Sequence, residues 1–371
     1  MRIAFMHRRL AGGGTEADLR RMASGLAARG HDLHVFAART DGAPAGVSVH
    51  RVPHLRAGRL GRLVSFAIAA PRAVARERFD VVVGFGRTPR QDVVRVGGGT
   101  HRSYLATMEA AGQRARVRGP YHRAILALER RMFAPEGHRR VLAVSRRVAD
   151  EVARDYAVPA ARLRVVYNGV DLERFHPRRR AEEGARVRAA LGSGDRPVCM
   201  AIGSGFARKG FDLLLARWAV DPPAGALLVL VGGDERLAHY RRQAATPALR
   251  DRVRVLGPRD DVDALLAGAD VACLPSRQEA FGNVVLEAAA AGVPVVTSRA
   301  AGAAELLDGE LATLLVDDPA DLGALGAAIA RALGGDWAGR SAAARRLAEA
   351  HPWTRHLDEV ERFFAEVARG G

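Results

Sequence analysis

Lysine is almost absent from this sequence, although the chain is strongly basic. Of its 57 basic residues one is a lysine, Lys209, and all the others are arginine. A P-loop needs Gly-Lys-Ser/Thr after a spaced glycine, whereas here Arg208 precedes the lysine and Gly210 follows it. A Schiff-base enzyme needs a buried amine, and this lysine lies in an expected turn. The scarcity of lysine therefore argues against most lysine-dependent chemistries.

Cysteine and long apolar runs are scarce as well. The two cysteines, Cys199 and Cys273, lie in apolar runs typical of strands, which predicts buried free thiols in a reducing compartment. No stretch approaches the roughly 20 apolar residues of a membrane-spanning helix. Residues 1–9 contain too few apolar residues for a signal peptide. We therefore expect a cytosolic protein.

The net charge of +16 at pH 7 leaves two explanations open. It could attract nucleic acid, an anionic membrane surface or a phosphorylated substrate. It could also reflect an arginine-rich, alanine-rich composition without a basic function. No zinc-finger spacing, RRM-type aromatic motif or other compact signature occurs, so a basic nucleic-acid-binding protein is the weaker, non-enzymatic alternative.

Short apolar runs alternate with helical stretches along the chain, a pattern typical of parallel α/β sheets. The length of 371 residues favours two domains, and the pattern restarts after a polar, charged stretch. We predict two Rossmann-like domains facing each other across a cleft, residues 1–170 and 197–350, joined by a linker over 171–196. A C-terminal helix over 354–369 is expected to pack back on the first domain.

The predicted elements can be placed by residue number. The predicted strands are 2–6, 32–36, 47–52, 80–84, 93–96, 141–144 and 163–167 in the first half, and 198–203, 227–232, 252–256, 271–274, 295–297 and 313–316 in the second. The predicted helices include 16–29, 261–268, 320–333, 337–350 and 354–369. Gly30 would end the first of these helices as a C-cap glycine.

The single lysine lies where open α/β sheets bind phosphates. Lys209 follows an apolar strand and a glycine-rich turn that begins at Gly203. Loops at the carboxyl ends of parallel strands commonly hold ligand phosphates. A compact ammonium differs from the planar fork of arginine, so one retained lysine indicates a phosphate contact. The alternative is a chance lysine at the start of a helix.

Two glutamates eight residues apart, Glu279 and Glu287, form the second strong pattern. Glu279 would lie in a loop at the carboxyl end of the sheet, and Glu287 one to two turns into a helix that Gly282 opens. The first amides of that helix, at Gly282 and Asn283, would offer an anion site. Glu287 could accept the hydroxyls of a ribose. Taken singly, the glutamates are also consistent with a helix cap and a solvated helix residue.

Together these features resemble the retaining GT-B glycosyltransferases of family 4, over nearly the whole chain. The resemblance is closest to the branch of lipopolysaccharide core glucosyltransferases. It is carried by the paired glutamates, the Arg208-Lys209-Gly210 turn, the glycine loop 12–14 and the segments 83–87, 167–171, 203–210 and 278–280.

The resemblance implies roles for the candidate catalytic residues. Arg208 and Lys209 would neutralise the donor diphosphate as it leaves, so that no metal ion or other cofactor is required. Glu279 would contact the donor sugar. The resemblance implies retention of the anomeric configuration, with departure and attack on the same face of the sugar. No second carboxylate is evident as a nucleophile.

The resemblance also implies a set of donor-binding residues. Gly13 and Gly14 would let the backbone approach the diphosphate, which residues without a β-carbon permit. Glu287 would bind the nucleotide ribose. The remaining positions are the turn at Gly203, the amides of Phe281, Gly282 and Asn283 and, for the base, Pro258 and Arg259.

Two residues of the first domain have open roles. His101 matches a histidine that many family members place against the donor sugar, although a loop histidine is also commonly structural. Asp18 could reach the sugar or the acceptor from the first helix, or it could compensate the helix dipole.

An acidic run, Asp260 to Asp263, allows a metal-binding interpretation. The preferred interpretation is that these residues start the helix predicted over 261–268. Asp260 or Asp261 would then cap that helix.

Two stretches of the first domain, 55–78 and 101–140, concentrate arginine. They predict peripheral docking on the anionic inner face of the cytoplasmic membrane, which would bring the enzyme to a lipid-linked acceptor. The alternative is a set of solvated helix faces in an arginine-rich protein.

The sequence and the resemblance favour a monomeric, retaining hexosyltransferase. It would move glucose from UDP-glucose to an acceptor like the lipopolysaccharide core, or to another lipid-linked glycan. A related transferase that uses UDP-N-acetylglucosamine or GDP-mannose is the alternative. An NAD-dependent oxidoreductase is disfavoured because Gly-x-Gly-x-x-Gly is missing after the first strand.

Overall fold

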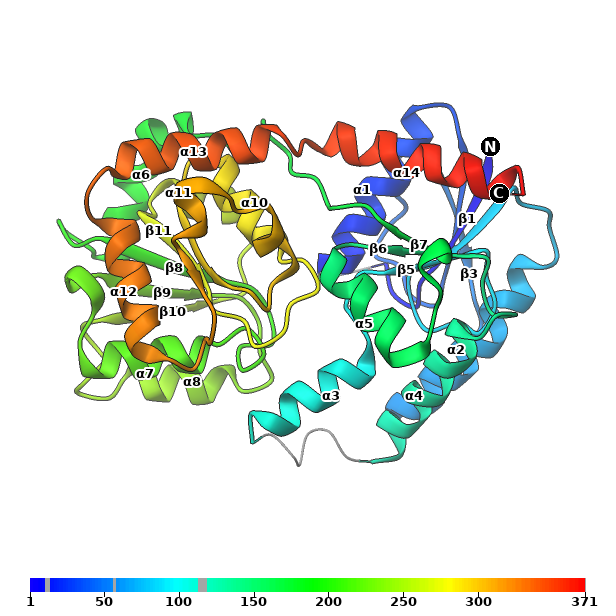
Figure 1. The fold of residues 1–371 in the computed structure, drawn as a ribbon, viewed down its shortest axis with the longest axis horizontal. Helices are drawn as coiled ribbons and strands as arrows, with labels where there is room; N and C mark the ends of the chain where they lie inside the picture. The colour runs from blue at the N-terminus through cyan, green and yellow to red at the C-terminus, as the bar shows by residue number, and fades with distance from the viewer. Residues whose placement is uncertain (11–13, 56–57, 113–118, 371) are drawn as a thin grey trace. The chain divides into compact units, whose positions relative to one another are not determined.

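The computed structural model describes residues 1–10, 14–55, 58–112 and 119–370. The chain forms two compact units (Figure 1). Unit 1 comprises Met1–Tyr167 and Thr354–Gly371, and unit 2 comprises Asn168–Trp353. The C-terminal segment is thus grouped with the N-terminal part of the chain, and the segment expected as a linker, 171–196, is grouped with unit 2.

Unit 1 contains a parallel sheet of seven strands in the order β3-β2-β1-β4-β5-β6-β7. Every predicted strand of this half is present, and the observed ends differ from the predicted ones by at most two residues. The strands are β1 Arg2–Met6, β2 Asp32–Ala37, β3 Val47–Arg51, β4 Val81–Gly84, β5 Val93–Val96, β6 Arg140–Ala143 and β7 Leu163–Val165.

Helices cover both faces of the unit 1 sheet. Helix α14 packs against α1 so closely that a β-carbon at Gly25 would lie 2.5 Å from a methyl group of Leu357. On another helix, α2, the side chains of Phe66 and Ala70 are buried with Met6 of β1 in one apolar cluster. The helices are α1 Gly14–Ala28, α2 Gly58–Val74, α3 His101–Ala110, α4 Pro120–Phe133, α5 Arg146–Tyr156 and α14 Trp353–Ala368.

Unit 2 contains a second parallel sheet, of six strands in the order β10-β9-β8-β11-β12-β13. Its strands also lie where the apolar runs predict them, within two residues at each end. They are β8 Val198–Ile202, β9 Leu227–Val231, β10 Val253–Gly257, β11 Val271–Leu274, β12 Val295–Ser298 and β13 Leu315–Val316.

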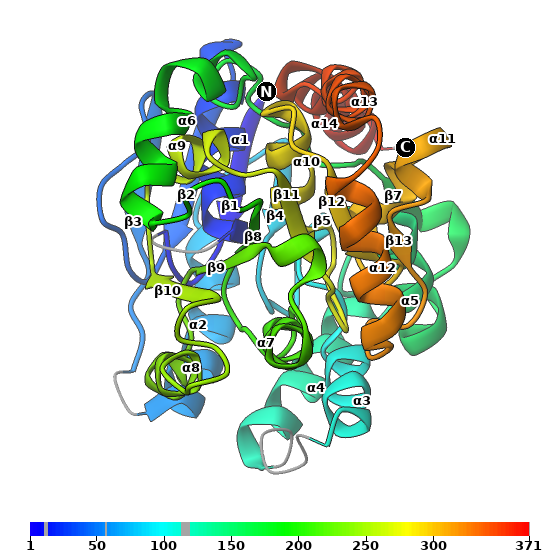
Figure 2. The ribbon, with the colours of Figure 1, turned by 90° about the vertical axis from the view of Figure 1, so that its left-hand side faces the viewer.

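The helices of unit 2 lie on both faces of its sheet. Figures 1 and 2 show α7, α8 and α12 on one face, and α6, α9, α10 and α13 on the other. The helices are α6 Arg178–Leu191, α7 Phe211–Val220, α8 Leu237–Ala244, α9 Val262–Ala267, α10 Asn283–Ala290, α11 Gly309–Ala312, α12 Leu322–Leu333 and α13 Trp337–Glu349.

Each sheet has one point at which the strand order reverses. In unit 1 the reversal lies between β1 and β4, and in unit 2 it lies between β8 and β11. In open α/β sheets the loops after two such strands diverge to opposite faces and leave a crevice at the carboxyl end, where ligands bind. The topology therefore marks one candidate edge in each unit.

The two cysteines are neighbours in the unit 2 core. Cys199 on β8 and Cys273 on β11 are buried free thiols whose Sγ atoms are 3.0 Å apart, as expected for their apolar strands. Burial raises the pKa of the Cys199 thiol, so it stays protonated and unreactive at neutral pH.

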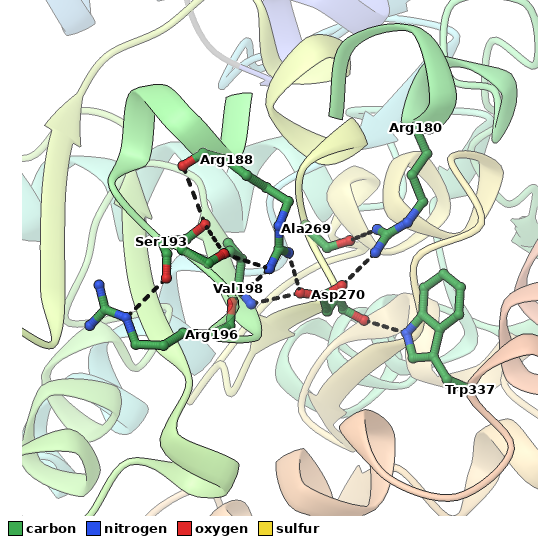
Figure 3. Close-up of polar contacts among 9 residues, drawn as sticks. Arg180, Arg188, Ser193, Arg196, Val198, Ala269, Asp270 and Trp337 are labelled. Carbon is green, nitrogen blue, oxygen red and sulfur yellow. Dashed lines mark hydrogen bonds and ion pairs between the residues drawn. The ribbon is translucent and has the colours of Figure 1, made fainter. Parts of the chain in front are cut away.

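A carboxylate at the opposite, amino end of these strands attaches α6 to unit 2 (Figure 3). The carboxylate of Asp270 accepts hydrogen bonds from Arg180 at 2.5 Å, from Arg188 at 2.7 Å and from the amide of Val198 at 2.8 Å. The Asp270 carbonyl accepts from the Trp337 indole at 2.8 Å. These contacts explain why a stretch of polar sequence forms an ordered helix.

We predict that Asp270→Asn lowers the free energy of unfolding by about 2 kcal/mol, because two guanidinium groups lose their counter-charge. Burial alone would raise the pKa of Asp270, but the Val198 amide and the two arginines lower it. The contribution is therefore present above the unfolded-state pKa and lost as pH falls through the folded-state pKa. Urea unfolding at neutral and acid pH measures this loss. Asp317→Asn, in a solvent-exposed pair with Arg299, is the control; equal effects of both variants would contradict the prediction.

Candidate functional site

Three charged side chains meet at the switch point of unit 2. Lys209 and Arg208 follow β8, and Glu279 follows β11, so the parallel pairing of β8 with β11 brings them to one edge. The Lys209 Nζ atom lies 2.5 Å from Glu279 Oε2, and Arg208 Nη1 lies 3.1 Å from the same oxygen. The Lys209 and Glu279 side chains are 11% and 12% exposed, so the pair is largely withdrawn from solvent.

Two glycines make room for this lysine. A β-carbon at Gly203, whose φ is +148°, would lie 2.5 Å from the Cε atom of Lys209. Gly210, on the other side of the lysine, has a φ of +75°, and a β-carbon there would lie 2.0 Å from the Pro275 carbonyl oxygen. A larger residue at Gly203 would push the lysine side chain aside, and one at Gly210 would collide with the Pro275 backbone.

The backbone holds Glu279 independently of its side chain. The Glu279 amide donates to the Ala300 carbonyl at 3.0 Å, and its own carbonyl accepts from Gly302 at 3.1 Å. Burial by itself would raise the pKa of Glu279, but Lys209 and Arg208 outweigh it and lower the pKa to about 2. The carboxylate is therefore ionised at neutral pH and serves as the counter-ion of both cations.

The predicted helix after Glu279 is α10, and Gly282 is its N-cap with a φ of +92°. Asn283 is its first residue, and its side-chain oxygen accepts from the Asn168 amide at 2.8 Å. Phe281 is buried just before the helix. Glu287 is half-buried, one turn further along α10. These predicted donor-binding residues thus share one helix start beside the charged cluster.

Pro258 and Arg259, predicted to lie near a base, follow β10 and are exposed. Pro258 lies beside Gly233, which follows β9, so it belongs to the same edge of the sheet. The Arg259 guanidinium donates two hydrogen bonds to Asp261, at 2.7 and 2.5 Å.

The acidic run 260–263 is neutralised by arginines. Asp263 pairs with Arg174 at 3.2 Å and with Arg179 at 3.0 Å. Asp261 is the N-cap residue of α9, but its side chain makes no capping hydrogen bond, so the predicted carboxylate cap is wrong. The reason is that the Asp261 carboxylate bonds to Arg259 instead. Across the described ranges, no group of His, Cys, Asp and Glu side chains is arranged to hold a metal ion.

Asp18 is engaged within unit 1. It lies in α1 and is buried, with Oδ2 3.4 Å from an Nη atom of Arg95 on β5. This ion pair joins a helix to the sheet, which neither sequence-based interpretation of Asp18 included. Gly14 is the first residue of α1, whereas Gly12 and Gly13 lie outside the described residues.

His101 is the first residue of α3 and is buried by a network of polar groups. Its amide donates to both carboxylate oxygens of Glu129, at 3.0 and 2.9 Å. The Tyr156 hydroxyl donates to the same carboxylate at 2.6 Å. The imidazole Nε2 lies 2.9 Å from Nδ1 of His122, and the two rings stack with an angle of 8°.

This environment keeps His101 neutral. Burial lowers its pKa to about 3, and the nearby Arg87 and His122 add to the effect. A neutral imidazole can donate a hydrogen bond from one nitrogen and accept at the other, but it carries no charge. His101 is therefore equipped for hydrogen bonding rather than for acid catalysis at neutral pH.

Sequence reasoning missed the residues that hold these loops. Glu129 is the one acidic residue of α4, a helix with several arginines. Apart from this, nothing in the neighbouring sequence indicates that Glu129 is buried. Arg95 and His122 are likewise brought in from other elements by the fold.

Two family models match the chain, one in its N-terminal part and one in its C-terminal part. The model for Glycosyltransferase Family 4 matches residues 12–174, and the model for Glycosyl transferases group 1 matches residues 196–334. A curated relative, D-inositol 3-phosphate glycosyltransferase of Xylanimonas cellulosilytica, is 30% identical over 82% of this chain and 80% of its own length. This chain is a family 4, group 1 glycosyltransferase.

Another relative of this glycosyltransferase is WaaG of Escherichia coli, a lipopolysaccharide glucosyltransferase. It is 26% identical over 85% of this chain and 86% of its own length. The crystal structure of WaaG matches with a TM-score of 0.82 and 24% identity over 100% of both chains. The structure of Anabaena HepE with UDP and glucose matches with a TM-score of 0.74 and 20% identity, over 98% and 99% of the chains. The fold is therefore of the GT-B kind, with two Rossmann-like parallel sheets.

We predict that His101 stays neutral through the physiological pH range. Its pKa of about 3 lies below the value of about 6.5 for an unfolded histidine. As pH falls below about 6.5, the unfolded chain binds a proton that the folded chain does not, so this group reduces stability. NMR titration of the imidazole nitrogens measures the pKa. In His101→Gln, the free energy of unfolding should decrease less between neutral and acid pH than it does in the wild type. A His101 resonance that titrates near pH 6.5 would show the prediction to be wrong.

Proposed function

We propose that this glycosyltransferase is a retaining hexosyltransferase that uses UDP-glucose as the donor. The observation that carries the proposal is the cluster of Arg208, Lys209 and Glu279 at the switch point of unit 2. Two cations opposite one carboxylate leave a net positive charge, which suits a diphosphate. The likeness to WaaG and to HepE, whose structure was obtained with UDP and glucose, supports the choice of donor.

The proposed reaction breaks the bond between the anomeric carbon and the diphosphate oxygen. Arg208 and Lys209 stabilise the charge that develops on the leaving phosphate, without a metal ion. The acceptor hydroxyl attacks the same face that the phosphate leaves, and its proton passes to the departing phosphate oxygen. Glu279 orients the donor sugar, and Glu287 accepts hydrogen bonds from the ribose hydroxyls.

The two ends of the donor site should respond differently to mutation. Lys209→Ala is expected to lower kcat by about 10²-fold or more, as for loss of one charge stabiliser. Glu287→Ala is expected to weaken UDP binding by about tenfold, with a smaller effect on kcat. Lys209→Arg is the matched control, since it keeps the charge but replaces the compact ammonium by a planar fork. Wild-type turnover by Lys209→Ala would refute the proposed role.

A thermal-shift panel of UDP-, GDP- and ADP-sugars tests the donor. A ligand that binds the folded state raises Tm, and UDP-glucose is expected to raise it most. Stabilisation by GDP-mannose or UDP-N-acetylglucosamine, without an effect of UDP-glucose, would replace the proposed donor. Mass spectrometry of a lipopolysaccharide-core acceptor after incubation then tests the transfer itself.

We further propose that helix α2 docks this cytosolic enzyme on an anionic membrane that carries the acceptor. Three apolar side chains spaced four residues apart on α2, Leu60, Val64 and Ile68, are 38%, 36% and 47% exposed. Residues 53–76 contain five arginines and no acid. An apolar stripe flanked by cations suits an anionic lipid surface. Among the described residues, no helix has the length and apolar character to cross a bilayer.

Liposome sedimentation tests this surface. We expect the wild type to bind vesicles with anionic phospholipid, and Leu60→Glu combined with Ile68→Glu to bind several-fold less. Val220→Glu, at a side chain that is 76% exposed in unit 2, is the control for an added acid at an exposed apolar site. Equal recovery of the wild type with anionic and neutral vesicles would exclude this docking mode.

A further inference from the structure

A pocket lies at the switch point of unit 1, the counterpart of the charged cluster in unit 2. It forms where β1 and β4 end, and two connected hollows of about 170 and 140 Å³ share His7, Glu16, Gly86 and Arg87. The carboxyl ends of these two strands are the place where the topology favours a ligand. Neither the paired glutamates nor the lysine turn belongs to this unit.

Two polar groups of the pocket have no partner among the residues that the structure describes. Arg8 is half-buried in its wall, and its guanidinium makes no hydrogen bond or ion pair with any described residue. The Nδ1 atom of His7 is buried and also has no hydrogen-bond partner among the described residues. Its other nitrogen, Nε2, lies 3.4 Å from Glu16 Oε1. Buried polar groups normally have partners, so these two side chains are available to a polar ligand that enters the hollow.

The charge around Arg8 is predominantly positive. Arg9 lines the same hollow, and Arg62 is close enough to act on Arg8 electrostatically. Arg87 lines it as well, but its guanidinium pairs with the Glu129 carboxylate at 3.2 Å. Burial lowers the pKa of Arg8, and the positive charges of Arg9 and Arg62 also lower it, whereas Tyr121 and Glu16 raise it; the net effect is a lowered pKa. Glu16 is the one acid that lines this hollow in the described structure. A dianion bound here would relieve the repulsion and satisfy the guanidinium.

Apolar side chains line the same hollow. Leu63 and Phe66 come from α2, and Ile125 comes from α4. Tyr121 of α4 closes the rim, and the Arg59 guanidinium lies 4.9 Å from the centre of its ring. The pocket thus offers both charged and carbon-rich side chains, which suits a phosphate ester better than a bare inorganic ion.

We propose that Arg8 binds a phosphomonoester on the acceptor, so that the sugar or polyol of the membrane-borne acceptor that enters this pocket is phosphorylated. This proposal rests on the proposed transferase function and deepens it by naming the acceptor class. Arg8 forms the direct contact, His7 donates or accepts a hydrogen bond to the same group, and Arg9 and Arg62 supply long-range attraction. Arginine suits this role because its planar fork matches phosphate in a bidentate geometry.

Titration calorimetry and NMR on the full chain test the proposal with glucose 6-phosphate, glucose and inorganic phosphate. We expect glucose 6-phosphate to bind and to shift the Arg8 Nε–H and His7 ring signals, and glucose to leave them unchanged. Arg8→Gln should weaken binding at least about tenfold, and Arg8→Lys should retain part of the affinity. Arg242→Gln removes the same charge from the exposed surface of α8 in unit 2 and should leave the affinity unchanged.

The source of the phosphate follows from the same titrations. Tighter binding of glucose 6-phosphate than of inorganic phosphate supports a phosphorylated acceptor. Equal affinities would show that the pocket binds free phosphate without a contribution from the sugar, and would overturn the proposal. Unchanged affinity in Arg8→Gln, or no shift of the Arg8 and His7 signals, would also overturn it. Competition with saturating UDP assigns the pocket to the donor instead, a third contrary result.

Binding of UDP-glucose is measured in parallel on the wild type and on Arg8→Gln. If the wild type binds UDP-glucose but Arg8 does not affect phosphate binding, the acceptor proposal alone fails. If no UDP-sugar binds while glucose 6-phosphate still binds through Arg8, the proposed donor fails and the phosphate site stands. The two failures are therefore distinguishable.

Discussion

The contact of Glu279 with Lys209 and Arg208 is the constraint around which unit 2 is arranged. Two cations withdrawn from water need a counter-charge, because an unpaired buried charge is costly. Glu279 supplies it, and the backbone of residues 300–302 holds Glu279 in place without using its carboxylate. The cluster therefore keeps a net positive charge in a fixed position. A diphosphate that enters it meets cations already oriented by the protein.

The duplicated sheet gives both units the same geometry for different purposes. In each, the strand order reverses once, and the loops at the carboxyl ends of the two central strands carry unusual polar groups. In unit 2 the cations are paired by Glu279. In unit 1 the guanidinium of Arg8 has no such partner among the described residues, while Asp18 is committed to Arg95. The two sheet edges therefore differ in how their cations are neutralised, and so in the anionic ligand that each can bind.

The sequence predicts the sheets well because their strands are short valine- and leucine-rich runs between turns. It also predicts the helix that Gly282 opens, and the approach of Lys209 to Glu279 follows once β8 and β11 are taken as neighbours. It does not predict α6, which lies in the stretch expected as a linker, because the many charged side chains of that helix obscure its apolar face. Contacts such as Asp18 with Arg95 or His101 with Glu129 depend on tertiary packing between residues far apart in the sequence.

The arginine content can be divided by what each side chain contacts. Many arginines bond to a carboxylate, as Arg277 does to Asp212 at 2.7 Å, and Arg180 and Arg188 do to Asp270. In such a pair the charge of the arginine is neutralised by a carboxylate of the protein itself. These arginines therefore do not indicate a site for an anionic ligand. A half-buried guanidinium that faces a hollow and lacks a carboxylate is not explained in that way. Part of the basic charge of this glycosyltransferase therefore serves ion pairs within the protein. Arg8 is not in such a pair, and its guanidinium is suited to bind an anionic ligand.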